Sequence, residues 1–204
     1  MVEVQPEQTN QSKNTTQMFQ NIPESKSDDA LPKGVVLDKD GKPCRTCTSL
    51  SSWRALTKQA DKKATNPSTT ATPALAAAAT PSPSELPSDC PPDVEQLGRS
   101  TWTLLHSMAA TYPEKASTEH QSNMEGFLKF FSKLYPCWVC ADDFQAWMAH
   151  PSGRNQPKLG SRKEFGWWMC EAHNEVNRKL GKKEFDCRFW EERWRSGWKD
   201  GRCD

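Results

Sequence analysis

The chain has 204 residues, a net charge of +1 and eight cysteines. This length suits one domain with a tail, and the near-neutral charge does not favour nucleic acid or a membrane surface as a partner. Many cysteines are typical of oxidising compartments, yet we expect neither a secretory signal nor a membrane span, because the chain lacks the apolar runs that both require.

The first 89 residues contain only two aromatic side chains, Phe19 and Trp53, but nine prolines. A segment with so little apolar surface to bury does not offset the entropy that ordering costs. The sequence therefore predicts a largely disordered N-terminal arm over residues 1–89, which ends in a linker rich in Ala, Pro, Ser and Thr over 57–89. The folded domain is predicted over residues 90–204.

The arm carries a Cys-x-x-Cys motif, Cys44-Arg45-Thr46-Cys47. A flexible linker as long as the one that follows it spans roughly 35–40 Å on average. The domain itself has an expected radius of gyration of only ~13 Å. The two arm cysteines are thus able to reach almost any site on the domain, or a site on a partner subunit.

The domain sequence predicts helices from its apolar spacing and its caps. Pro91-Pro92-Asp93 opens the first helix, and capping-box patterns at Thr118 and Ser161 open two more. Another helix is expected over about 137–149, and a shorter one over about 189–198. Because hairpin signals are missing and the loops are short, we predict an all-α fold: a four-helix bundle plus a short fifth helix.

A second Cys-x-x-Cys, Cys137 to Cys140, follows Pro136 directly. Proline ends one helix and suits the start of the next, which places Cys137 near a helix N-terminus, where the dipole favours a reactive thiolate. We expect a redox-active dithiol with Cys137 more exposed and Cys140 deeper. The alternatives are a structural bridge or half of a zinc site. About 90 residues separate the two motifs, however, whereas compact zinc modules keep that gap at about 12–20.

The predicted helix after Ser161 has one polar face on an otherwise apolar surface. Its members are Cys170, His173, Asn174 and Asn177. Together with Arg99, Trp102 and His106 from the first helix, this face suggests a slot for a large flat heterocycle with a phosphate tail. The alternative is an ordinary solvated face with a few tryptophans at its boundary.

The remaining cysteines have two possible uses. A bridge between Cys170 and Cys187 would close a loop of about 17 residues and contribute about 3 kcal/mol. Cys90 and Cys203 lie at the two ends of the domain, and their spacing leaves open whether they pair within one chain, between two chains, or not at all.

These residues resemble the Erv/ALR family of FAD-dependent sulfhydryl oxidases from Cys90 to the C-terminus. The motifs that carry the resemblance are Leu97-Gly98-Arg99 with Trp102, Leu105 and His106; Tyr135-Pro136-Cys137 with Cys140; Cys170 through Leu180; Phe185-Asp186-Cys187; and Arg193-Trp194 with Gly197-Trp198. The segment around Cys44 and Cys47 also looks like the shuttle arm of the mitochondrial members.

The resemblance implies FAD held without a covalent bond in the mouth of the bundle. Cys140 would then lie next to the flavin, and Cys137 would be the sulfur attacked from outside. It also implies that Cys170–Cys187 is structural. The positions that surround the cofactor in the family are here Gly98, Arg99, Trp102, His106, Tyr135, Cys170, His173, Asn174, Val176, Asn177, Lys179, Lys182, Arg193 and Trp194.

As a member of this family the protein would generate disulfides by relaying electrons from protein thiols through Cys44–Cys47 and Cys137–Cys140 to FAD. The acceptor after FAD would be dioxygen or cytochrome c. The family also implies the mitochondrial intermembrane space and a cysteine-containing import receptor as thiol donor. Cys90 and Cys203 are absent from some fungal-like members, but cysteines at corresponding ends bridge two subunits in animal members, so we predict a homodimer joined by Cys90 and Cys203 of opposite chains. No metal is expected. The rival readings are a disulfide-stapled interaction module and a flavin-free thiol carrier.

Overall fold

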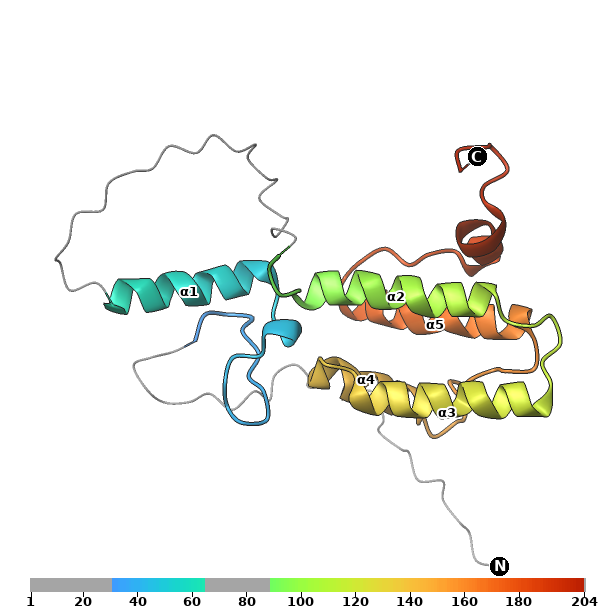
Figure 1. Ribbon diagram of the computed structural model, residues 1–204, viewed down its shortest axis with the longest axis horizontal. Helices are drawn as coiled ribbons and strands as arrows, with labels where there is room; N and C mark the ends of the chain where they lie inside the picture. The colour runs from blue at the N-terminus through green and yellow to red at the C-terminus, as the bar shows by residue number, and fades with distance from the viewer. Residues whose placement is uncertain (1–30, 65–88, 204) are drawn as a thin grey trace, which may run out of the picture. The chain divides into compact units, whose positions relative to one another are not determined.

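The computed structural model describes residues 31–64 and 89–203 (Figure 1). Its elements in chain order are η1 (Arg45–Cys47), α1 (Leu50–Ala64), α2 (Val94–Ala110), α3 (Thr118–Leu134), α4 (Trp138–Met148), α5 (Arg162–Lys179), η2 (Cys187–Phe189) and η3 (Glu192–Ser196). Within these ranges the β structure is a single isolated bridge between Leu37 and Pro43. The predicted all-α fold is confirmed.

Side-chain caps explain where three of the helices begin. The Asp93 carboxylate accepts from the backbone N–H of Gln96 and starts α2, and Ser161 accepts from Glu164 and starts α5. Helix α3 begins at Thr118 as predicted, but its cap lies one residue earlier, because Ser117 and not Thr118 accepts from the backbone N–H of His120. Each cap satisfies a backbone donor that has no partner within the helix.

The four bundle helices lie in two pairs, α2 beside α5 and α3 beside α4 (Figure 1). Their apolar faces meet in one core, whose fully buried side chains include Leu128, Phe165, Trp168 and Met169. Burying each such side chain contributes about 1.5–3 kcal/mol. The core is thus the main reason that α2 and α5 hold a fixed register, and it is this register that positions the polar residues they share.

The short fifth helix takes the form of two differently wound segments. Residues 187–189 form a 3₁₀ turn and residues 192–196 form a π-helical turn, which ends at Gly197 with a φ of +78°. Between them Trp190 is buried against Gly166 of α5, where a Cβ would lie 2.5 Å from the indole ring. Trp190 at this glycine and the Cys170–Cys187 disulfide therefore both anchor the segment to α5.

The prediction of disorder is wrong for residues 32–64 of the arm. These residues include η1 and α1, and Val35, Cys44, Cys47 and Leu50 are buried. Composition averaged over the whole arm hid this short segment, which has few apolar side chains but packs them on the domain. Residues 1–30 and 65–88 lie outside the described residues, so disorder there, and the division of the chain at residue 90, stay predictions. None of the helices described is long and apolar enough to cross a membrane.

Candidate active site

Both Cys-x-x-Cys motifs form disulfides at the start of a helical turn. Cys44 is bonded to Cys47 and is the N-cap of η1, while Cys137 is bonded to Cys140 and is the N-cap of α4. The N-terminus of a helix carries a partial positive charge. A thiolate released at Cys137 would therefore be stabilised by the first N–H groups of α4, as the sequence predicted.

The two motifs pack against each other. Cys44, Cys47 and Cys137 belong to one buried cluster, with exposed fractions of 9%, 6% and 0%. Cys140 is partly buried at the edge of the same cluster. The expectation that Cys137 is the more exposed cysteine of its pair is thus wrong for this state, because the arm covers it.

Three hydrogen bonds tie the arm to the domain around these sulfurs. The indole N–H of Trp138 donates to the backbone carbonyl of Leu37 at 2.8 Å, and the Thr46 hydroxyl donates to the carbonyl of Pro136 at 3.3 Å. The third joins Arg45 Nη2 to the carbonyl of Pro91 at 3.3 Å. Residues inside each Cys-x-x-Cys motif therefore bind the backbone on the other side of the contact.

A buried carboxylate links the beginnings of two helices. One oxygen of Asp93 accepts from Gln96 N in α2 at 2.8 Å, and the other accepts from Leu50 N, the first residue of α1, at 3.0 Å. Next to Asp93, the backbone N–H of Val94 donates to the carbonyl of Thr48, and Thr48 is fully buried. The sequence identified Asp93 only as the start of α2, because a local pattern does not reveal a second helix that begins 43 residues earlier.

Four aromatic rings gather between α2, α5 and the C-terminal segment. Trp102 stacks on His173 with centroids 4.1 Å apart, and His106 stacks on Trp194 at 4.3 Å. His106 Nε2 and His173 Nδ1 lie 3.0 Å apart, which completes a ring cluster of Trp102, His106, His173 and Trp194.

The hydrogen bonds of His106 assign its protons. Trp190 Nε1, which is only a donor, gives its hydrogen to His106 Nδ1 at 2.9 Å. A neutral His106 therefore carries its proton on Nε2 and donates it to His173 Nδ1, so that the remaining proton of His173 sits on its own Nε2.

Burial keeps both histidines neutral. It lowers the pKa of His106 to about 3, with further lowering by His173 and Arg193. Burial likewise lowers the pKa of His173 to about 4, helped by the charges of Lys182 and Arg193. The guanidinium of Arg193 also lies 4.3 Å from the Trp194 ring centroid. A neutral aromatic surface is thus bordered by two cations, a set of groups that fits a flat heterocycle with an anionic tail.

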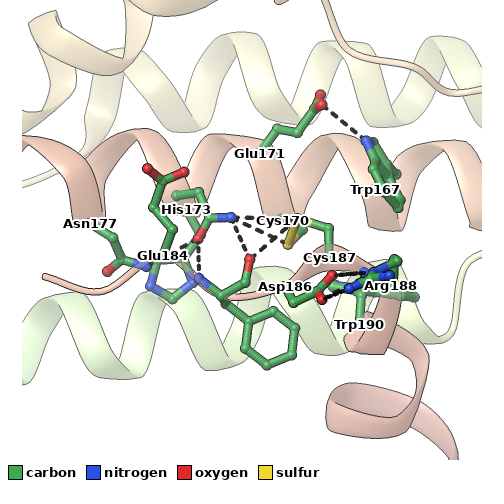
Figure 2. The surroundings of a disulfide bond; sticks show 12 residues. Trp167, Cys170, Glu171, His173, Asn177, Glu184, Asp186, Cys187, Arg188 and Trp190 are labelled. Carbon is green, nitrogen blue, oxygen red and sulfur yellow. Dashed lines mark hydrogen bonds and ion pairs between the residues drawn. A yellow bond between two sulfur atoms is a disulfide. The ribbon is translucent and has the colours of Figure 1, made fainter.

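Asn174 serves the protein backbone. Its amide donates to the carbonyl of Phe185 at 2.7 Å and accepts from Phe185 N at 2.8 Å, beside the Cys170–Cys187 disulfide. Figure 2 shows this disulfide with His173 and Asn177 on the same helix, and Asn177 donates to Asn174 at 3.4 Å. Both polar ends of the Asn174 side chain are therefore used to fix the segment after α5, a role that helical spacing alone did not reveal.

Other predicted cofactor residues lie outside the ring cluster. Arg99 is exposed and pairs with Glu95 at 3.8 Å, and Lys179 pairs with Asp143 at 2.6 Å. Tyr135 lies against the sulfur cluster of Cys137, and burial raises the pKa of its hydroxyl. The half-buried positions Gly98 and Val176 lie on α2 and α5. Among the described residues no group of three or more His, Cys, Asp or Glu side chains is placed to hold a metal ion.

Similarity to known proteins is specific and covers most of the chain. The sequence pattern of the Erv1/Alr family matches residues 99–195. The chain is 46% identical over 171 residues to the mitochondrial FAD-linked sulfhydryl oxidase ERV1 of Saccharomyces cerevisiae, covering 80% of this chain and 88% of that protein. The chain is 39% identical to the mitochondrial FAD-linked sulfhydryl oxidase erv1 of Schizosaccharomyces pombe, and the match covers 77% of this chain and 88% of that protein. The crystal structure of the yeast Erv1 core matches with a TM-score of 0.52 and 53% identity, over 56% of this chain and 93% of that one.

Proposed function

The chain belongs to the Erv1/Alr family, and on that premise we propose that it is an FAD-linked sulfhydryl oxidase, an enzyme that converts protein thiols to disulfides. The observation that carries the proposal is the contact between two disulfides, in which Cys44, Cys47 and Cys137 share one buried cluster. A structural bridge would not need a second, equally short disulfide loop packed against it. Two exchanging disulfides do need that contact.

The ring cluster supports FAD as the cofactor. Trp102, His106, His173 and Trp194 would hold the flat rings, and Lys182 and Arg193 would face the phosphates. The family positions Gly98, Arg99, Tyr135, Cys170, Asn174, Val176, Asn177 and Lys179 would border them. FAD would supply a two-electron acceptor, which the resemblance implies lies next to Cys140, and dioxygen or cytochrome c would take up those electrons.

The cysteines would pass electrons by two disulfide exchanges. A substrate thiolate attacks the Cys44–Cys47 bond, and the second substrate thiol resolves the mixed disulfide, which leaves both shuttle sulfurs reduced. A shuttle thiolate then attacks Cys137, and the Cys137–Cys140 bond breaks with Cys140 as the leaving thiolate. The second shuttle thiol displaces Cys137. One substrate disulfide is formed, and the two electrons end on Cys137 and Cys140.

The similar yeast proteins are named mitochondrial, and we assign this chain to the mitochondrion. Within it, the intermembrane space is the compartment that would suit a cysteine-rich chain with oxidised dithiols. The thiol donor there would be a cysteine-containing import receptor, which this enzyme would reoxidise. This assignment rests on the family resemblance together with the two oxidised Cys-x-x-Cys motifs.

A homodimer would cover apolar side chains that the described residues expose on α2 and on α3. Leu104, Phe130 and Leu134 have exposed fractions of 54%, 62% and 78%. Cys90 and Cys203 carry no disulfide within this chain. Large exposed apolar side chains favour a protein partner, and two unpaired cysteines at opposite ends of the domain suit bridges to a second copy.

Purification of the full chain tests the enzymatic proposal. The protein should be yellow, with flavin absorption, and should consume dioxygen when a small dithiol such as dithiothreitol is added. A colourless protein that does not consume dioxygen would reject the oxidase, and would leave the interaction module or the flavin-free thiol carrier as the function.

A further inference from the structure

We propose that the docked arm is a shield as well as a shuttle: while it is seated, thiols from solution do not reach the sulfurs of Cys44, Cys47 and Cys137. The proposal rests on the proposed function for the role of Cys44 and Cys47 as electron carriers. Movement of the arm between substrate and domain belongs to that relay, and the addition is that a seated arm keeps small thiols away from Cys137.

The burial of the sulfurs carries this inference. Thiol–disulfide exchange needs a thiolate to reach the sulfur that it attacks, so the rate depends on access. Cys137 has no exposed surface, and Cys44 and Cys47 expose less than a tenth of theirs. The seated state therefore suits exchange between the two motifs, which touch, but excludes a folded substrate protein from either one.

The seated state is held by contacts at both ends of the arm segment. At the sulfurs, Trp138 binds the Leu37 carbonyl and Thr46 binds the Pro136 carbonyl. At the start of α1, Asp93 accepts the N–H of Leu50. These are a small number of hydrogen bonds between a short segment and a large domain. Removing one or two of them is expected to raise the unseated population about fivefold to thirtyfold.

Selectivity follows from the same geometry. An unseated arm presents Cys44 and Cys47 to substrate proteins and also uncovers Cys137 to any small thiol. A tightly seated arm limits the access of substrate proteins to Cys44 and Cys47, and it also limits the access of small thiols to Cys137. The contacts of Asp93, Thr46 and Trp138 thus set how often small thiols compete with the shuttle for Cys137, which makes these three residues positioning residues for substrate choice.

The chain offers two substitutions that loosen the arm. Leu50→Pro removes the N–H that Asp93 accepts and the buried leucine side chain, at the first helical position, where the proline backbone is tolerated. Thr46→Val removes the hydroxyl that binds Pro136 and keeps the side-chain shape. Lys58→Ala, at an exposed position of α1, is the matched control.

The test measures how fast a small water-soluble alkylating reagent modifies the Cys137 thiol of the full chain, by timed quenching and mass spectrometry of the peptides. All variants carry Cys44→Ser, Cys47→Ser and Cys140→Ser, so that Cys137 is a free thiol without a sulfur partner in the arm. Leu50→Pro with Thr46→Val should speed alkylation of Cys137 about fivefold to thirtyfold. Lys58→Ala should match the parent, and all variants should react at one rate in denaturing urea.

Equal alkylation rates of Cys137 in the loosened variant and its parent would count against the shield. Adding Trp138→Phe and Arg45→Met removes the other two hydrogen bonds at the sulfurs, and an unchanged rate in that variant would overturn the proposal. The assay requires neither flavin nor turnover. A colourless protein in which the arm still protects Cys137 would therefore support the shield and reject the oxidase. A yellow, active protein in which the arm does not protect Cys137 would support the oxidase and reject the shield.

Discussion

Trp190 donates its indole N–H to Nδ1 of the buried His106 at 2.9 Å. This single bond joins the segment after the Cys170–Cys187 disulfide to the centre of α2. It also assigns the protons of both histidines, since His106 must then donate from Nε2 to His173. Trp190, which is not part of the ring cluster, therefore holds in place the histidine rings that would face a cofactor.

Gly166→Ala should displace that tryptophan. A Cβ at residue 166 would meet the Trp190 ring at 2.5 Å, and such overpacking costs about 1–3 kcal/mol. Urea unfolding should show this loss of stability, and flavin absorption per chain should fall. Gly126→Ala in α3 is the matched control, because a Cβ there meets nothing within 4 Å, and it should stabilise the helix by about 0.5–1 kcal/mol. Equal stability of the two variants would argue against the close packing of Trp190.

The neutral histidines predict a loss of stability in mild acid. The pKa of His106 falls from its ordinary value of 6.5 to about 3 on folding. The unfolded chain therefore binds a proton below pH 6.5 that the folded chain does not, and stability falls as the pH is lowered. Between pH 7 and pH 5 this linkage amounts to about 2 kcal/mol for His106, and His173 acts in the same direction.

Urea unfolding of the full chain across that pH range measures the effect. His106→Asn should reduce the dependence to the part contributed by His173, because the asparagine side chain does not titrate. A wild-type free energy of unfolding that stays constant from pH 7 to pH 5 would show that the folded state accepts these protons.

Asn174→Ala should destabilise the chain even when no flavin is bound. The substitution leaves the N–H and the carbonyl of Phe185 without their partner at 2.8 and 2.7 Å, which costs about 1–3 kcal/mol for each buried group. Thermal unfolding of flavin-depleted protein separates this role from cofactor binding. If Asn174→Ala lost flavin but its flavin-depleted form unfolded like the flavin-depleted wild type, Asn174 would be a cofactor ligand and would not stabilise the segment after α5.

Cys90 and Cys203 should report the oligomeric state. Electrophoresis without reductant should show a dimer that reductant converts to a monomer, and Cys90→Ser with Cys203→Ser should run as a monomer in both conditions. The exposed side chains of Leu104 and Phe130 should still associate the two copies in native gel filtration. A wild-type chain that migrates as a monomer without reductant would contradict the covalent dimer.

Local patterns in the sequence predicted the bundle well. The caps at Asp93 and Ser161 depend on a donor only three residues away, so a short sequence motif is enough to predict where these helices begin. The same holds for Cys137, whose place at the start of α4 follows from Pro136. Spacing also placed Trp102, His106 and His173 on facing helices, which the ring cluster confirms.

Contacts between distant segments were not predictable in this way. Cys137 was expected to be exposed because its helix position says nothing of the arm that covers it. Asn174 was grouped with cofactor residues because its helical face is polar, although its actual partner, Phe185, lies beyond the end of the helix. The folded segment before α1 was missed because its stability comes from the domain surface and from Asp93.

The most direct test of the relay is to trap the exchange between its two disulfides. Cys47→Ser with Cys140→Ser leaves Cys44 and Cys137, and Cys44→Ser with Cys140→Ser leaves Cys47 and Cys137. Both variants also carry Cys90→Ser and Cys203→Ser, and after mild oxidation, mass spectrometry of peptides from the monomer should find Cys137 bonded to the remaining shuttle cysteine in at least one of them. Free thiols at Cys137 in both variants would contradict direct electron transfer from the arm to the active-site disulfide.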